Sequence, residues 1–276
     1  MPAIKKSGKY FTLFKKKWLY LLVILLVAIA FFLNSAFNKD DTSQTPLNIT
    51  LWVWERPENL YFMKDEPVTY AYLAGTATKT DNGLSIYFRR QPLRIPDGSQ
   101  TMATVRIEDK SQEATFEDSD IEEISDFIVG ACLKDRENIS CQIDFDAAQS
   151  QIDFYKELIL VIRKKLPQRI KLSITALLSW CTDTDEPWFI GLPVDEAVPM
   201  FFRLGKNTDI YRRKIDQGEL VLDSQCQKSI GVSTDEPLPG KKYLQDKKIY
   251  IFNNNYWDED NWGIIKSDIE RILDEE

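Results

Sequence analysis

The chain has 276 residues, of which 43% are hydrophobic, and a formal net charge of −8 at pH 7. This hydrophobic content is sufficient for a folded core and excludes a chain that is disordered throughout. The sequence contains no histidine, which excludes Ser-His-Asp and Cys-His catalytic systems and removes the commonest protein ligand of transition metals. Any acid–base chemistry must therefore use carboxylates, lysine, tyrosine or arginine-assisted water.

The amino-terminal segment differs in kind from the rest of the chain. Residues 1–17 contain six lysines and no acidic residue, and they precede the uncharged run Trp18–Phe37. This order predicts a basic cytoplasmic tail over 1–17, a single transmembrane anchor over 18–37 and a linker over 38–48. A cleaved signal peptide is the alternative, because the most apolar part, Leu19–Leu33, is short for a membrane span. The domain beyond the linker is then expected outside an inner or plasma membrane.

The charge of the remaining chain limits its partners. Residues 1–39 contain seven lysines and no acidic residue, so residues 40–276 carry a formal charge of −15. A body this acidic argues against nucleic acid as a partner. The sequence therefore predicts a membrane-attached domain with no nucleic-acid function.

Eight short segments rich in β-branched and aromatic residues are predicted to be strands. They are Ile49–Trp54, Val68–Gly75, Ala103–Glu108, Ser140–Asp146, Lys171–Leu178, Ala197–Phe202, Ser229–Ser233 and Lys248–Phe252. Helical spacing of apolar residues predicts helices over Thr115–Cys132, Ile152–Leu166 and Trp262–Leu273. Strands that alternate with helices are typical of parallel β/α folds, and eight strands match a closed TIM-type (β/α)8 barrel. We expect residues 49–276 to form such an α/β domain, with an open doubly wound sheet as the alternative.

Two connections depart from a regular barrel. Leu84–Ile95 is predicted to form an extra hairpin arm between the second and third strands, and Leu204–Lys228 has only a weak helical pattern. The barrel is therefore expected to be irregular or decorated.

The four cysteines show no metal-binding spacing. Cys132, Cys141, Cys181 and Cys226 are far from a C-x-x-C arrangement. Outside the cytoplasm they could form disulfides, but their connectivity cannot be read from the sequence.

Two aspartates occupy alternate positions of the fourth predicted strand, in Ile143-Asp144-Phe145-Asp146. Side chains at i and i+2 of a strand project from the same face, so Asp144 and Asp146 share one face. Both faces of a parallel sheet are covered, so carboxylates at these positions must be paired, hydrated or functional. Arg106 on the third strand is the expected neighbour, and a purely structural Arg106–Asp144 pair is one possible outcome.

Several segments in order resemble a bacterial family catalogued as domain of unknown function 3142. The resemblance covers most of residues 51–252 and is carried by LWVWERPENL (51–60), RRQPLRIP (89–96), TVRIE (104–108), QIDFDA (142–147), LSITALLSWC (172–181) and VDEAVPMFFRLG (194–205). The family name implies no established activity.

The layout also resembles that of family 18 glycoside hydrolases, in which D-x-x-D-x-D-x-E ends the fourth barrel strand. On this pattern Asp144 and Asp146 fall on the second and third Asp, and Cys141 falls on the first. Ala148 falls on the Glu that is the general acid of that family. The resemblance therefore implies a related barrel whose proton donor is missing from the inherited position.

Function in a β/α barrel collects at the carboxyl ends of the strands, and this rule selects the candidate residues. As catalytic residues we predict Asp146, Asp144 and Glu108. As substrate-binding residues we predict Trp54, Glu55, Arg56, Arg106, Trp180, Arg203, Asp235 and Tyr256. Glu55 and Asp235 are further candidates for a second catalytic carboxylate, whereas Asp195 and Glu196 precede their strand and are expected to be structural. No cofactor is predicted; a Mg²⁺ or Ca²⁺ site built from two Asp and one Glu is a weaker alternative.

These patterns lead to two functional hypotheses of different classes. The first is a carbohydrate-active hydrolase, because a pair of carboxylates can donate a proton and attack or activate water at a glycosidic bond. The second is a non-catalytic envelope module that binds a glycan or a protein at the same mouth. A metal-dependent phosphoesterase is disfavoured by the absence of histidine.

Overall fold

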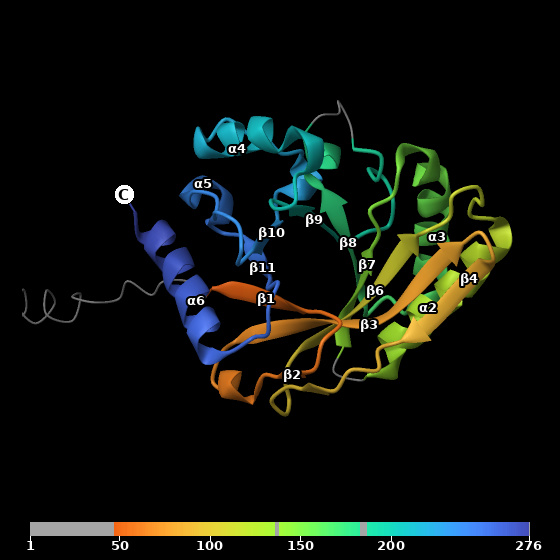
Figure 1. Cartoon of the computed structure of the whole chain (residues 1–276), viewed down its shortest axis with the longest axis horizontal. Helices are drawn as coiled ribbons and strands as arrows, with labels where there is room; N and C mark the ends of the chain where they lie inside the picture. Colours follow the sequence, from red (N-terminus) through yellow and green to blue (C-terminus); the bar gives the residue numbers. More distant parts are fainter. Residues whose placement is uncertain (1–46, 136–137, 183–186, 276) are drawn as a thin grey trace, which may run out of the picture. The chain divides into compact units, whose positions relative to one another are not determined.

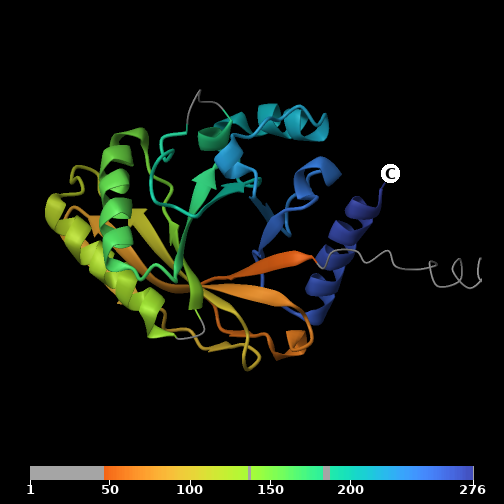
Figure 2. The same ribbon diagram turned by 180° about the vertical axis from the view of Figure 1, so that it is seen from behind.

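Strands from both ends of the chain meet and close a ring of eight parallel strands (Figures 1 and 2). The computed structural model describes residues 47–135, 138–182 and 187–275. Within these residues β1 pairs with β11 on one side and with β3 on the other, which closes the ring. The predicted TIM-type barrel is therefore confirmed, and the open doubly wound sheet is excluded.

The ring follows the order β1, β3, β6, β7, β8, β9, β10, β11. The bounds of its strands are Asn48–Val53, Val68–Thr80, Thr101–Asp109, Asn138–Asp144, Lys171–Leu177, Glu196–Met200, Ser229–Ser233 and Lys248–Phe252. All eight predicted strands are thus present, but β7 ends at Asp144 and β9 at Met200. The pairing of β7 with β6 ends at Asp144, which is opposite Arg106, and the pairing of β7 with β8 ends one residue earlier. Asp146 therefore lies just beyond the end of β7.

The predicted hairpin arm is present between the second and third barrel strands. β4 (Gly83–Phe88) runs antiparallel to the extended end of β3, and the two-residue strands β2 (Glu58–Asn59) and β5 (Leu93–Arg94) pair with each other. These additions make the barrel irregular on one side.

Helices lie outside the ring (Figure 1). Their bounds are α2 Asp118–Lys134, α3 Ile152–Lys165, α4 Thr208–Asp216, α5 Lys241–Leu244 and α6 Glu259–Asp274. The apolar faces of α2 and α3 pack with the outward side chains of β6 and β7 in one core cluster, and those of α4, α5 and α6 pack with β1, β10 and β11 in another. Short 3₁₀ turns are found at η1 Tyr61–Met63, η2 Gln149–Gln151, η3 Leu178–Cys181, η4 Gly205–Asn207 and η5 Ser224–Cys226.

The interior of the ring combines large aromatic side chains with a central polar group. Gln142 is fully buried, accepts a hydrogen bond from Trp52 Nε1 (2.7 Å) and donates one to Ser173 Oγ (3.0 Å). Gly231 on β10 leaves room for the Trp52 ring, since a Cβ there would lie 2.8 Å from that ring. These side chains fill the interior of the barrel at this level.

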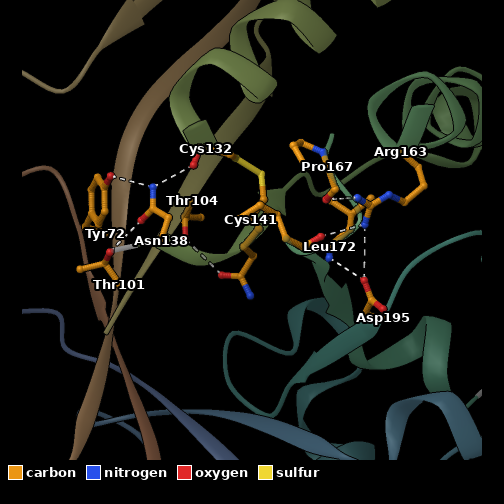
Figure 3. Close-up of a disulfide and its surroundings, with 12 residues drawn as sticks. Tyr72, Thr101, Thr104, Cys132, Asn138, Cys141, Arg163, Pro167, Leu172 and Asp195 are labelled. Atoms are coloured by element: carbon orange, nitrogen blue, oxygen red, sulfur yellow. Dashed lines mark hydrogen bonds and ion pairs between the residues drawn. A yellow bond between two sulfur atoms is a disulfide. The ribbon is translucent and has the colours of Figure 1, made fainter. Parts of the chain in front are cut away.

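Two disulfides use all four cysteines, and they join Cys132 to Cys141 and Cys181 to Cys226. The first ties the end of α2 to β7 (Figure 3). Beside it, Asn138 donates to the Cys132 carbonyl oxygen (3.1 Å) and accepts from Thr101 Oγ1 (2.8 Å). These links fix the start of β7 and hence the register of the strand that carries Asp144.

The predicted tail 1–17, the predicted anchor 18–37 and residues 38–46 of the predicted linker lie outside the described residues. Among the residues that the structure does describe, no helix combines the length and apolar character needed to cross a membrane.

Candidate functional site

Asp144 and Arg106 face each other at the carboxyl ends of neighbouring strands. β6 and β7 are parallel and their register pairs Arg106 with Asp144. Arg106 Nε lies 3.9 Å from Asp144 Oδ2, and Thr175 Oγ1 on β8 donates a hydrogen bond of 2.9 Å to Asp144 Oδ1. The alternation predicted for these two strands is thus confirmed, and the strand ends bring a cation and a carboxylate together at the mouth.

The protein environment favours the protonated form of Asp144. Its side chain is only 15% exposed, and this burial, together with the nearby charge of Asp146, raises the pKa of Asp144 to about 6. Arg106 and the hydrogen bond from Thr175 act in the opposite direction. Asp144 can therefore hold or release a proton near neutral pH.

Asp146 lies at the rim and is exposed as a residue. Protein atoms around its carboxyl group still raise its pKa by partial dehydration, an effect that Arg106 opposes. No ion pair within 4.0 Å reaches Asp146 from any described residue, in contrast to Asp144. This carboxylate is available to a ligand.

The carboxylate of Glu108 forms ion pairs with two cationic side chains. It lies 3.2 Å from Arg106 Nε and 2.6 Å from Lys110 Nζ, and it accepts a hydrogen bond of 3.4 Å from Thr78 Oγ1. These contacts suit a role of Glu108 in positioning Arg106.

A cavity of about 370 Å³ opens beside Asp144 and Asp146 at this end of the barrel. Its aromatic lining consists of Trp52, Trp54, Phe202, Tyr211 and Phe252. Phe202 and Phe252 are stacked, with centroids 5.8 Å apart, and Trp52 packs 6.1 Å from Phe202. The polar lining consists of Arg106, Asp144, Asp146, Thr175, Ser179, Arg203, Lys206 and Asn207. The mouth thus offers flat apolar rings next to charged and hydrogen-bonding groups.

A second hollow of about 400 Å³ adjoins the same carboxylates on the side of the loops after β6 and β7. It shares Arg106, Asp144 and Asp146 with the first cavity and is also lined by Glu108 and Ala148. The position that carries a Glu in the family 18 pattern is therefore at the site, but Ala148 brings no proton donor there.

The structure brings only part of the predicted site together. Of the predicted residues, those that line the main cavity are Trp54, Arg106, Asp144, Asp146 and Arg203. The others lie elsewhere: Glu108 lines the adjoining hollow, and Glu55 lines a separate hollow beside β4. The Arg56 guanidinium lies over the Tyr256 ring (5.9 Å), and Trp180 packs on Trp188 (5.2 Å). Asp235 accepts a hydrogen bond from Ser233. The roles assigned to all of them remain predictions.

Several cavity residues were not selected from the sequence. They include Trp52, Thr175, Met200, Phe202, Lys206, Tyr211 and Phe252. Alternation along the strands places Trp52, Thr175 and Phe252 on the inward face, and this signal could have found them. Lys206 and Tyr211 come from the irregular connection after β9, where no periodic pattern indicates orientation.

Asp195 and Glu196 lie at the opposite end of the barrel. Asp195 accepts a hydrogen bond from the Leu172 backbone N–H (2.8 Å), and Glu196 begins β9 and forms an ion pair with Lys248 (3.4 Å). Across the described ranges, no group of three or more Asp, Glu, Cys or His side chains has an arrangement that could hold a metal ion.

Three solved structures align with this chain over most of its length. A putative chitinase A from Streptomyces coelicolor aligns over 83% of this chain and 97% of its own, with 9% identity and a TM-score of 0.52. The spore cortex-lytic enzyme SleL of Bacillus cereus aligns over 68% of this chain, with 14% identity and a TM-score of 0.41; the aligned part is 50% of that enzyme's chain. A tamarind chitinase-like lectin aligns over 82% of this chain and 98% of its own, with 9% identity and a TM-score of 0.48.

Only the fold follows from these comparisons. The alignment with the Streptomyces protein shows a shared barrel architecture, at an identity too low to assign a function. No sequence-family model matches the chain, and no curated protein matches it. The resemblance to domain of unknown function 3142 therefore stays a prediction, whereas the closed barrel of eight parallel strands is observed.

Proposed function

We propose that the mouth of the barrel binds a carbohydrate. The observation that carries this proposal is the cavity of about 370 Å³, whose lining includes five aromatic side chains and two carboxylates. Sugar rings present C–H faces that pack on aromatic rings, and their hydroxyl groups donate hydrogen bonds to carboxylates. The likeness in fold to a putative chitinase is consistent with this ligand class.

Hydrolysis of a glycosidic bond is the second candidate function. It is supported by the raised pKa of Asp144, about 6, next to Asp146, which has no ion pair among the described residues. A protonated Asp144 could donate its proton to the leaving oxygen while ionised Asp146 attacks the sugar or activates water. Ala148 weighs against inheritance of the family 18 mechanism, so any catalysis would rest on the two aspartates themselves.

One set of variants distinguishes binding from hydrolysis. The purified full chain is incubated with a panel of soluble polysaccharides, and both bound ligand and released reducing ends are measured. Asp146→Asn and Asp144→Asn are compared with wild type, and Asp153→Asn, which changes a carboxylate that is 98% exposed on α3, is the matched control.

Each outcome has a defined meaning. Reducing ends that appear with wild type and the control but not with either site variant support hydrolysis. Binding without release, weakened by the site variants alone, supports the binding module and rejects hydrolysis. If no polysaccharide in a broad panel binds the wild-type chain, or if the site variants bind as well as wild type, the carbohydrate proposal is wrong.

We also propose that residues 18–37 anchor the chain in the inner or plasma membrane and that the barrel lies on the extracytoplasmic side. The pairing of all four cysteines in disulfides supports an oxidising compartment. The test is protease treatment of intact and permeabilised spheroplasts followed by amino-terminal sequencing. Digestion of the barrel in intact spheroplasts supports the proposal, protection contradicts it, and a mature protein that begins near residue 37 would show a cleaved signal peptide.

A further inference from the structure

The charges around the main cavity are distributed unevenly. Asp144 and Asp146 lie on the β7 side, whereas Arg203 and Lys206 line the same cavity from the segment that follows β9. Residues 40–276 carry a formal charge of −15, so two adjacent cations at the cavity run against the character of the molecule. They place positive charge at the cavity lining, where an anionic group of a ligand could be bound.

Arg203 is held in place by contacts that fix its backbone and its side chain separately. Its φ of 51° lies in the left-handed region, which is uncommon for a residue other than glycine. The backbone N–H donates to Glu236 Oε1 (2.8 Å), and Glu236 is itself held by an ion pair with Arg212. Unusual backbone conformations that the surroundings enforce are often found at ligand sites.

The guanidinium group of Arg203 is placed over the aromatic lining. It lies 4.9 Å from the centroid of the Phe252 ring and donates a hydrogen bond of 3.3 Å to Asn254 Oδ1. A guanidinium group that is stacked and hydrogen-bonded loses little further freedom when it binds an anion. Arg203 is therefore preorganised at the rim of the cavity.

Neither of these two cations has a carboxylate partner. Among the described residues, no Asp or Glu oxygen lies within 4.0 Å of the charged nitrogens of Arg203 or Lys206, whereas Arg106 is shared between Glu108 and Asp144. Arg106 therefore already has carboxylate partners within the protein. The charged groups of Arg203 and Lys206 are left for a ligand.

We propose that the carbohydrate bound at the mouth is acidic, and that Arg203 and Lys206 bind its anionic substituent. This inference rests on the proposed carbohydrate-binding function. Asp144 and Asp146 repel a negative group, so the substituent lies toward α4 while hydroxyl groups of the sugar face the aspartates. The two sides of the cavity together fix the orientation of the saccharide.

The test compares neutral and anionic polymers that share a backbone. Binding of the full chain to glycol chitin and carboxymethyl chitin, to hydroxyethyl cellulose and carboxymethyl cellulose, and to methyl-esterified and de-esterified polygalacturonate is measured by calorimetry at low and high salt. For at least one backbone we expect the anionic form to bind about tenfold more tightly or better, with a smaller difference at high salt.

Two double variants with the same change in charge distinguish the effect of the cavity cations on binding from the effect of cations elsewhere on the surface. Arg203→Gln with Lys206→Gln should abolish the preference for the anionic form, measured as the ratio of the affinities for the anionic and neutral polymers. Arg213→Gln with Lys214→Gln changes two exposed cations of α4 outside the cavity lining and should keep the preference. Lys206→Gln alone, at an exposed position, should reduce the preference even if the Arg203 variant does not fold.

The outcomes for this inference differ from those for the proposed function. If neutral and anionic polymers bind equally well, carbohydrate binding stands and the acidic ligand is rejected. If both double variants weaken anionic binding to the same extent, the preference is a general effect of charge and the inference is wrong. If no polymer of either kind binds, the proposed function fails and this inference fails with it.

Discussion

At the scale of single residues, Asp144 links the geometry of the mouth to the stability of the protein. Its pKa is raised from 3.8 to about 6 in the folded chain by burial and by the charge of Asp146. Between these two pH values the folded state therefore binds more protons than the unfolded state. The contribution of Asp144 to stability is complete below about pH 4 and is lost as the pH rises through about 6.

We predict that Asp144→Asn stabilises the protein at neutral pH. Asparagine keeps an acceptor for Thr175 Oγ1 but carries no charge that must be buried. The free energy of unfolding should exceed that of wild type by on the order of 2 kcal/mol above about pH 7, and this difference should vanish toward about pH 4. Urea denaturation at a series of pH values measures this difference in the free energy of unfolding.

The control for this prediction is Asp153→Asn. The Asp153 side chain is 98% exposed, so its removal should give a small difference from wild type that changes little with pH. A difference for Asp144→Asn that is equally flat between about pH 4 and 7 would show that Asp144 titrates normally. In that case its proposed role as a proton donor would also lose its support.

The residues of the site could be predicted from the sequence only in part. Asp144, Asp146 and Arg106 were found because charged side chains at inward positions of a parallel strand are unusual and alternation fixes their direction. Phe202 and Phe252 were missed because an aromatic residue at a strand end has the same pattern whether it belongs to the core or to a cavity. Whether such a residue lines the cavity depends on how the ring of strands closes. Local sequence patterns do not predict that closure.

At the scale of elements, the Cys181–Cys226 disulfide supports one wall of the cavity. It joins η3, after β8, to η5, before β10. The segment between the two cysteines contains β9, η4 and α4, and it supplies Met200, Phe202, Arg203 and Tyr211 to the cavity. The disulfide therefore encloses a part of the chain that lines the cavity together with Asp144.

We predict that the two disulfides differ in their effects on stability and binding. The separation between cysteines is 45 residues for Cys181–Cys226 and 9 for Cys132–Cys141. Chain entropy in the unfolded state then gives losses of about 4 and about 2.5 kcal/mol when each pair is changed to serine. Urea denaturation should show this order, and calorimetry should show weaker ligand binding only for Cys181→Ser with Cys226→Ser. Equal binding by both double variants would mean that the wall needs no covalent support.

Elements with a strong local pattern were predicted closely. β10 and β11 have the predicted bounds, because each is a short apolar run between polar residues. β7 and β9 end earlier than predicted, since the apolar pattern continues through Phe145 and Phe202 after pairing with the neighbouring strands has ended. α4 was only a weak signal because its nine residues are mostly polar and bury just Tyr211 and Ile215.

At the scale of the whole molecule, the two ends of the barrel have different charged groups. The carboxyl ends of the strands carry Asp144 and Asp146 beside the cavity, whereas the amino ends carry Glu196 and Lys248. Strand count and alternation predicted this polarity. Ring closure also required the pairing of β1 with β11, which joins segments about 200 residues apart. In β/α barrels the first end is the usual place of function and the second supports stability.

The group at the amino ends is a closed ionic network. Glu196 accepts hydrogen bonds from Tyr250 and Ser229, and Lys248 Nζ lies 3.4 Å from Glu196 and 2.6 Å from the Tyr250 hydroxyl. Burial alone would raise the pKa of Glu196, but Lys248 and these hydrogen bonds lower it overall. Burial also lowers the pKa of Lys248, so each charge depends on the other.

We predict that variants at the two ends separate stability from ligand binding. Glu196→Gln leaves Lys248 buried without a counter-charge and should lower the free energy of unfolding by about 3 kcal/mol, with ligand affinity unchanged at a temperature where the variant is folded. Asp146→Asn should weaken ligand binding and change stability by less than about 1 kcal/mol, because Asp146 is exposed and has no ion pair among the described residues. Replacing Glu196 and Lys248 together by Gln and Met should recover most of the lost stability, since it removes both buried charges. Loss of ligand affinity in Glu196→Gln as large as that in Asp146→Asn would contradict this division, because it would place part of the binding energy at the end of the barrel remote from the cavity.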